Sequence, residues 1–169
     1  MNPAERGISA LNACVKHELQ SILNHSIQDI TSRFAGIQLQ EENTTLSNDI
    51  CTVHTVLEGS RPAALLLCAD TALLTRLARS IMHRDAVTPR DIEDVATEYF
   101  NIICGRIAAG IFQAAHIPSR FQSPLFRTGL YLPESDPERQ CVLHYTSGDN
   151  EGAHLIYMGL LPPDNPPPL

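Results

Sequence analysis

The stretch TPRDIEDVATEYFNIICGRIAAGIF, from Thr88 to Phe112, predicts a long helix around which the rest of the chain is organised. Its start is well marked, because Thr88 can cap the helix, Pro89 suits the first helical position and Asp91 can complete a capping box. At about 100° per residue the helix has one broad apolar face, which should face the core. That face carries Ile92, Val95, Ala96, Tyr99, Ile103, Ile107, Gly110 and Ile111.

The opposite face of this helix is unusual for a surface that meets only solvent. It gathers Asp94, Glu98, Asn101, Gly105 and Ala109, whose side chains are short or absent. Asparagine is mildly unfavourable inside a helix, and glycine costs about 1 kcal/mol relative to alanine. The pattern favours a face kept for contact with another molecule. An acid and an amide three residues apart also occur by chance on solvated helices.

Composition and charge narrow the function classes. The chain has 169 residues, enough for one domain with a substantial core. Its formal net charge is -7, and its Lys and Arg residues are scattered singly. A nucleic-acid partner is therefore not expected, since a phosphate-binding surface needs clustered basic residues.

The cysteines and the apolar segments favour a cytoplasmic protein. Five cysteines, odd in number and widely spaced, lie within apolar segments, as is typical of buried free thiols in a reducing compartment. The N-terminus lacks the pattern of a secretory signal, and no segment approaches the roughly 18 apolar residues of a membrane span. We therefore expect no membrane association.

Hydrophobic periodicity predicts the order of the other elements. We expect a helix over residues 4–23 with a weaker continuation towards Ile30, a hairpin over 50–57 and 63–69, a helix capped by Asp70, and a second hairpin over 141–146 and 154–160. This order predicts an α+β fold, with an antiparallel or mixed sheet built from two hairpins and helices packed on one face. Residues 1–160 should form one domain, followed by a flexible Pro-rich tail at 161–169.

Other common kinds of active site find little support. The chain has no phosphate-binding glycine loop, nucleophile elbow or zinc-protease motif. His54, His144 and His154 lie in strand-like runs and could meet in space, but lone strand histidines are usually satisfied side chains, so no metal site is expected.

The long helix also resembles a known family. Glu98-Tyr99-Phe100-Asn101, with Gly105 four residues after the asparagine and Arg106 next, resembles the ExxN signature helix of the CheC/CheX/FliY chemotaxis phosphatases, and most of all the single-motif CheX branch. The preceding helix, with its Ala78 to Met82 segment, and the segment Ser123 to Gly129 echo further parts of the CheX pattern. The sequence departs from that pattern in Tyr99 and Phe100, where small or aliphatic residues are usual.

The resemblance implies a function and a set of residues. It implies a phosphatase that removes the aspartyl phosphate from a CheY-type response regulator, in chemotaxis or a related two-component system. Glu98 would dock on a lysine of the partner, and Asn101 would orient the attacking water. Asp94, Gly105, Arg106 and Ala109 would complete the docking surface. The protein would need no cofactor of its own, because the receiver domain supplies Mg²⁺.

Alternatives remain open at this point. The same face could belong to a non-catalytic adaptor that binds phosphorylated receiver domains, or the chain could be an unrelated α+β domain for a small ligand. Proteins of the CheX branch often dimerise by joining sheet edges, so a homodimer is also among the expectations.

Overall fold

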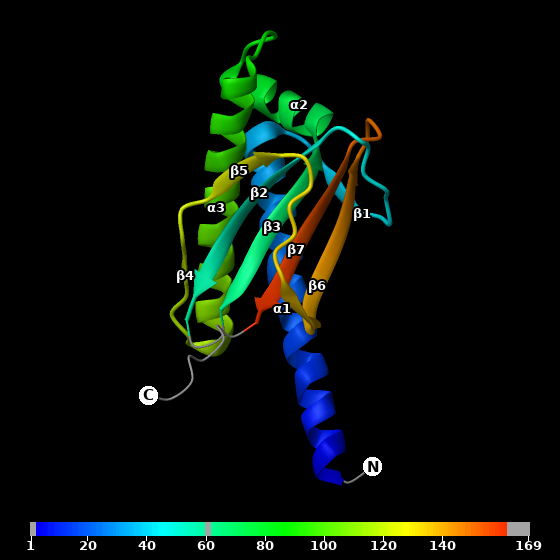
Figure 1. Ribbon diagram of the computed structural model, residues 1–169, viewed down its shortest axis with the longest axis vertical. Helices are drawn as coiled ribbons and strands as arrows, with labels where there is room; N and C mark the ends of the chain where they lie inside the picture. Colours follow the sequence, from blue (N-terminus) through cyan, green and yellow to red (C-terminus); the bar gives the residue numbers. More distant parts are fainter. Residues whose placement is uncertain (1–2, 60–61, 162–169) are drawn as a thin grey trace, which may run out of the picture.

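A computed structural model describes residues 3–59 and 62–161, with side chains from residue 16 onward (Figure 1). The Pro-rich segment expected to form a tail lies, apart from Leu161, outside the described residues. The elements, in order, are α1 (Pro3–Ala35), β1 (Leu39–Glu41), β2 (Ile50–Glu58), β3 (Ala63–Asp70), α2 (Thr71–Met82), α3 (Pro89–Ala115), β4 (Arg120–Phe121), β5 (Leu125–Thr128), β6 (Ser135–Ser147) and β7 (Gly152–Leu160).

The strands form one antiparallel sheet in the order β1-β6-β7-β3-β2-β4, with β5 also pairing with β2. The two predicted hairpins, β2–β3 and β6–β7, make its centre and are joined through β3 and β7. β3 is buried along its whole length, as its continuous apolar run AALLLCA predicts for a strand covered on both faces. The expected α+β class is confirmed, and the sheet is antiparallel rather than mixed.

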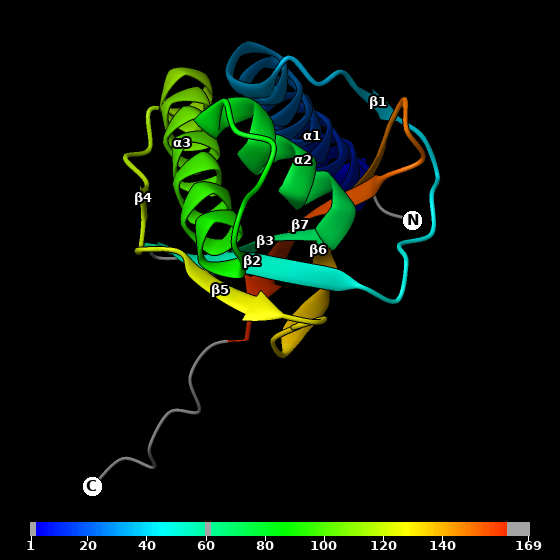
Figure 2. The same cartoon turned by 90° about the horizontal axis from the view of Figure 1, so that it is seen from above.

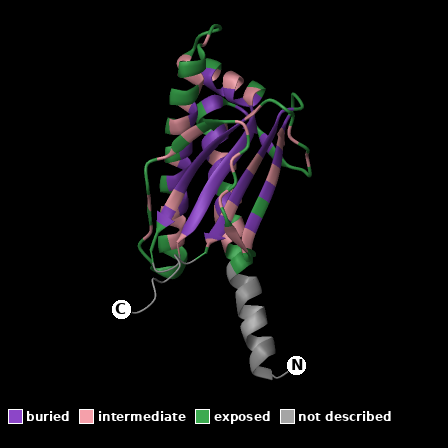
Figure 3. Cartoon of the chain, in the orientation of Figure 1, coloured by how far each residue is buried: buried purple, intermediate pink, exposed green. Residues whose placement is uncertain are grey.

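The three helices of the described residues lie on one face of the sheet (Figure 2). Between helices and sheet lies the main core, in which the strands β2, β3, β6 and β7 meet the inward faces of α1, α2 and α3 (Figure 3). Leu23, Ile27, Leu65, Leu77, Phe100, Ile103, Ile107, Tyr145 and Leu155 are among its fully enclosed side chains. The sheet and two neighbouring helices thus hold α3 by its inward side.

The other face of the sheet carries a smaller apolar core. Ala64, Leu66, Cys68, Ile156 and Met158 form a second apolar cluster there, against which Tyr131, Leu46 and Leu160 pack. The segment after β5 is held on this face by Thr52, whose hydroxyl donates to the Gly129 carbonyl at 2.7 Å and accepts from the Tyr131 N–H at 3.2 Å.

The first helix is longer than its sequence predicts. The expected end near Leu23 is wrong, because α1 continues without a break to Ala35. The polar residues after Leu23 are accommodated by side-chain bonds. Ser26 Oγ donates to the Ile22 carbonyl at 2.7 Å, and Asn24 Oδ1 accepts from the Tyr145 hydroxyl at 2.8 Å. The helix ends before Gly36, whose φ of 66° is a left-handed conformation that glycine adopts without strain.

Asp70 occupies the predicted N-cap position of α2, but its side chain makes no capping hydrogen bond. Its Oδ1 instead accepts from the Ser47 N–H at 2.8 Å, and its Oδ2 accepts from the Gly152 N–H at 2.7 Å. The carboxylate is buried, so it ties the loop before β2 to the start of β7. Asp70 therefore joins segments that are distant in the sequence instead of capping α2.

Cys51, Cys68, Cys104 and Cys141 are buried free thiols, as expected, while the side chain of Cys14 is outside the described part. Burial raises the pKa of the Cys104 thiol to about 12, which keeps it protonated and unreactive at neutral pH. Across the described residues, none of the helices combines the length and the apolar character that crossing a membrane requires.

Candidate functional site on the outward face of helix α3

The start of α3 has the predicted capping box. Thr88 Oγ1 accepts from the Asp91 N–H at 3.1 Å, and Asp91 Oδ2 accepts from the Thr88 N–H at 2.9 Å. The hydrogen bond from the Thr88 backbone N–H is the main cause that lowers the pKa of Asp91. The helix ends at Ala115, where His116 adopts a left-handed conformation and donates its N–H to the Phe112 carbonyl. The helix therefore runs from Pro89 to Ala115 and continues past Phe112, the last residue of the predicted helix.

The two predicted faces of α3 are confirmed. Asp94, Glu98, Asn101, Gly105 and Ala109, which we call the α3 outer face, are all exposed. Within residues 16–59 and 62–161, the Glu98 and Asn101 side chains have no hydrogen-bond or ion-pair partner. Asp94 makes one long ion pair, with 3.9 Å between its Oδ2 and Arg90 Nε. The polar groups of Glu98 and Asn101 are thus available to an incoming molecule.

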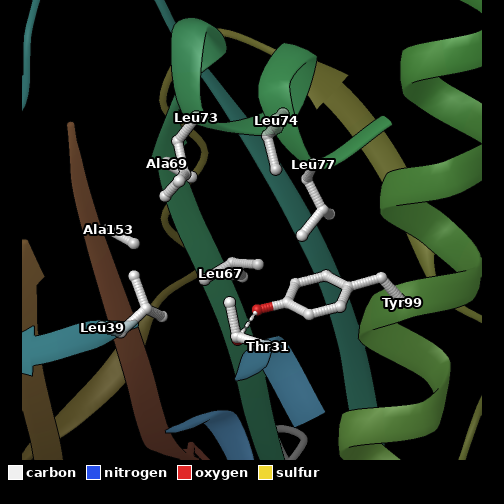
Figure 4. A pocket seen from close by; sticks show the side chains of 9 residues that line it. All are labelled: Thr31, Leu39, Leu67, Ala69, Leu73, Leu74, Leu77, Tyr99 and Ala153. Carbon is white, nitrogen blue, oxygen red and sulfur yellow. Dashed lines mark hydrogen bonds between the residues drawn. The ribbon is translucent and has the colours of Figure 1, made fainter. Parts of the chain in front are cut away.

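Tyr99 and Phe100, the residues between Glu98 and Asn101, point into the core and fix the direction of their neighbours. Phe100 is completely buried, and Tyr99 is 5% exposed. The Tyr99 hydroxyl lies 2.5 Å from Thr31 Oγ1 of α1, and burial raises its pKa to about 12 (Figure 4). These bulky residues belong to the main core between the helices and the sheet. They anchor α3 at the turn that carries the motif.

The cavity beside Tyr99 is too small for a ligand. It has a volume of about 10 Å³ and is lined by Thr31, Leu39, Leu67, Ala69, Leu73, Leu74, Leu77, Tyr99 and Ala153 (Figure 4). A cavity of roughly 10–15 Å³ holds at most one water molecule. This cavity therefore gives no support to the alternative of a small-ligand-binding domain.

Arg106 has a partner within the chain. Its guanidinium pairs with Asp29 of α1, and the same carboxylate accepts from Arg33 Nε at 2.9 Å. The Arg106 side chain is 41% exposed, so it can still contact another molecule at the edge of the α3 outer face. Because Asp29 holds it towards α1, it does not extend over Gly105.

Gly105 and Gly110 lie five residues apart on α3 in contrasting environments. A Cβ atom on Gly110 would lie 2.7 Å from Cγ2 of Ile22, so close packing of α1 requires this glycine. A Cβ atom on Gly105 would meet nothing within 4 Å. The described fold therefore gives no packing reason for a glycine at 105, although one costs about 1 kcal/mol in a helix interior.

Replacing these glycines should have opposite effects on stability. Gly105→Ala is expected to raise the free energy of unfolding by about 0.5–1 kcal/mol, because it removes backbone entropy from the unfolded chain without a clash. Gly110→Ala is expected to lower it by about 1 kcal/mol, since overpacking costs about 1–3 kcal/mol and exceeds the gain in propensity. Urea unfolding of both variants measures the difference. Equal shifts in the two would contradict this assignment.

The strand histidines do not assemble into one cluster. His144 and His154 stack with ring centroids 4.1 Å apart, and they bond to Asn43 Oδ1 and the Thr44 carbonyl respectively. His54 lies apart from them in a group with Arg127 and Tyr131, where its Nε2 accepts from Arg127 Nε at 3.1 Å. Burial and the Arg127 charge lower the pKa of His54. In the described part of the chain, no set of three or more His, Cys, Asp or Glu side chains is placed to hold a metal ion.

Phe112, for which the sequence pattern predicted no role, lies in line with the α3 outer face. Phe112 is 51% exposed and lies edge-on to His116, with ring centroids 6.0 Å apart. The helical phase could have identified it, because eleven residues bring Phe112 within about 20° of Asn101 around the axis.

Comparison with known proteins identifies the fold. No family model and no curated protein matches this sequence significantly. Solved structures do match. The chemotaxis protein CheX from Desulfovibrio desulfuricans superposes with a TM-score of 0.70 at 12% identity, over 84% of this chain and 99% of that one. The chain has the CheX-like fold.

Two further structures support this assignment. CheX in a CheX–CheY–BeF3–Mg²⁺ complex from Borrelia burgdorferi gives a TM-score of 0.68 at 12% identity, covering 83% of this chain and 97% of that one. A CheC-like superfamily protein from a Shewanella species gives 0.68 at 10% identity, covering 84% and 98%. The predicted family resemblance thus holds for the fold as a whole. At such low identity, a role for individual residues of this CheX-like chain has to be argued from its own geometry.

Proposed function

We propose that this CheX-like protein is a protein aspartyl-phosphate phosphatase that acts on a CheY-type response regulator. The observation that carries the proposal is the placement of Glu98 and Asn101. Both are exposed on one side of a rigid helix, and the two residues between them are buried in the core. A positioned pair on a rigid element suits a reaction that depends on geometry.

The chemistry needed is modest, because an acyl phosphate is already reactive. The receiver domain would supply Mg²⁺ to balance the charge of the phosphoryl group, so that orienting a water molecule in line is the main contribution left. The carboxamide of Asn101 can donate to and accept from this water, and it carries no charge to repel the phosphoryl group. Glu98, one turn away, would pair with a lysine of the receiver.

The rest of the α3 outer face would support docking. Gly105 and Ala109 leave the helix surface flat, so that the receiver can approach the backbone closely, and Asp94 adds a negative charge beyond Glu98. Arg106, held by Asp29, would contact the receiver at the margin. In one of the related structures CheX is bound to CheY, and that CheX shares the fold of this chain.

The first experiment measures phosphate release from a phosphorylated CheY-type receiver domain with and without the protein. We expect acceleration by the wild type. Glu98→Ala should raise the half-saturating concentration about tenfold or more, because it removes a charge pair that becomes desolvated at the interface. Glu93→Ala is the matched control, since Glu93 is an exposed glutamate of the same helix outside the α3 outer face.

The same experiment separates the phosphatase from the adaptor. Tight binding that depends on phosphorylation, without any acceleration by the wild type, would favour the adaptor. A receiver that neither binds nor loses phosphate faster would contradict both.

We also propose that the protein forms a homodimer through the β6 edge. In the described residues, β1 pairs only with 145–147 of β6, so residues 135–143 have no strand neighbour on that side. An unpaired strand edge can add a strand from a second copy. Light scattering at micromolar concentration should give twice the monomer mass, and a monomer mass would count against the dimer.

A further inference from the structure

The surface of α3 beyond the ExxN motif leads from Asn101 to an exposed aromatic ring. Phe112 lies about 16 Å further along the helix axis than Asn101 and at almost the same angle around it. About half of its surface is exposed, at 51%. A large apolar side chain on the face that carries Asn101 can contact a molecule that binds to that face.

The helix surface between these two residues is nearly free of side chains. Gly105, Ala108 and Ala109 are the outward residues of the intervening turns, and Ala108 is half-buried. The long side chain of Arg106 is held away towards α1 by Asp29. A molecule seated over Asn101 could therefore lie along the helix and reach Phe112 without displacing a side chain of residues 16–59 or 62–161.

The dimensions suit a single protein partner. Glu98 and Phe112 are separated by about 21 Å along the axis, at 1.5 Å per residue. A typical specific interface covers about 800 Å² on each partner, which is some 30 Å across. The surface is acidic at Asp94 and Glu98 and aromatic at Phe112, and aromatic side chains often provide most of the binding energy of an interface.

We propose that Phe112 is the apolar anchor of the receiver-binding surface and a determinant of which response regulator binds. The inference rests on the proposed function, because it assigns the partner of the α3 outer face to a receiver domain. The receiver would present a basic group to Glu98 and an apolar pocket about 16 Å from its phosphorylation site, matching the spacing between Asn101 and Phe112. Regulators with a polar surface at that second position would bind weakly.

The test is the dissociation constant for a CheY-type receiver domain loaded with beryllium fluoride and Mg²⁺. Phe112→Ala should weaken binding about tenfold or more, as expected for an aromatic anchor. Phe112→Leu should keep much of the affinity, because it preserves an apolar contact. Phe34→Ala is the matched control, since Phe34 has a similar exposure of 48% but lies on α1, and it should bind like the wild type. Thermal unfolding checks that each variant is folded.

The outcomes separate this inference from the proposed function. If the wild type binds the receiver and Phe112→Ala binds equally well, the anchor is wrong while the docking surface around Glu98 stands. If Phe34→Ala weakens binding as much as Phe112→Ala, the specific role of Phe112 is also refuted. If the wild type does not bind the loaded receiver, the proposed function fails together with the inference.

Discussion

Replacement of Asn101 by alanine is expected to reduce the acceleration of receiver dephosphorylation by about 100-fold or more, a typical effect of losing a group that positions or stabilises the reacting atoms. The side chain is exposed and makes no hydrogen bond within the described residues, so its removal should leave the fold unchanged. The measurement is the rate of phosphate release at saturating protein, next to the affinity for the receiver loaded with beryllium fluoride.

Asn101→Asp sharpens this test, because it keeps the size of the side chain and adds a negative charge. A carboxylate at this position would repel the phosphoryl group, so the aspartate variant should be no more active than the alanine variant. Retained binding together with lost catalysis would support the role of Asn101 in orienting water. Full activity of Asn101→Ala would overturn that role, even if Glu98 proved essential for docking.

Replacement of Asp70 by alanine should cause a large loss of stability, about 3 kcal/mol. The buried carboxylate accepts hydrogen bonds from the Ser47 and Gly152 N–H groups, so its removal breaks both bonds and leaves the buried Gly152 N–H without this partner. For a chain of this length, such a loss lowers the melting temperature by about 10 °C. Thermal and urea unfolding both measure it.

Two controls isolate the contribution of these hydrogen bonds. Asp70→Asn keeps one acceptor oxygen and should lose less stability than Asp70→Ala. Asp49→Ala removes an exposed carboxylate from the same loop and should cost under about 1 kcal/mol. If Asp70→Ala were as stable as Asp49→Ala, the carboxylate would not be holding the loop to β7.

The sequence predicted those features of the chain that depend on local order. The capping box of Thr88 and Asp91 involves residues three apart, so the start of α3 follows from the sequence. Helical periodicity separated the buried face of α3 from its outer face, although it missed the fully buried Phe100. The alternation and turn residues of the two hairpins likewise fixed the pairing of β2 with β3 and of β6 with β7.

The tertiary structure decided the features that depend on distant residues. Asn24, in the unbroken part of α1, accepts a hydrogen bond from the hydroxyl of Tyr145, which lies 121 positions further along the chain. Asp70 reads as a helix cap in the sequence, yet its hydrogen bonds go to Ser47 and Gly152.

The candidate site itself divides in the same way. The sequence alone determined that Glu98 and Asn101 share one side of a helix, because three residues make nearly one helical turn. Only the packed structure shows that nothing in the described chain fills the space over Gly105, while Ile22 fills the space over Gly110. It also shows that Asp29 of α1 holds Arg106. The physical reason is that helical phase is set by the local backbone, whereas open space and ion pairing depend on where the other helices come to lie.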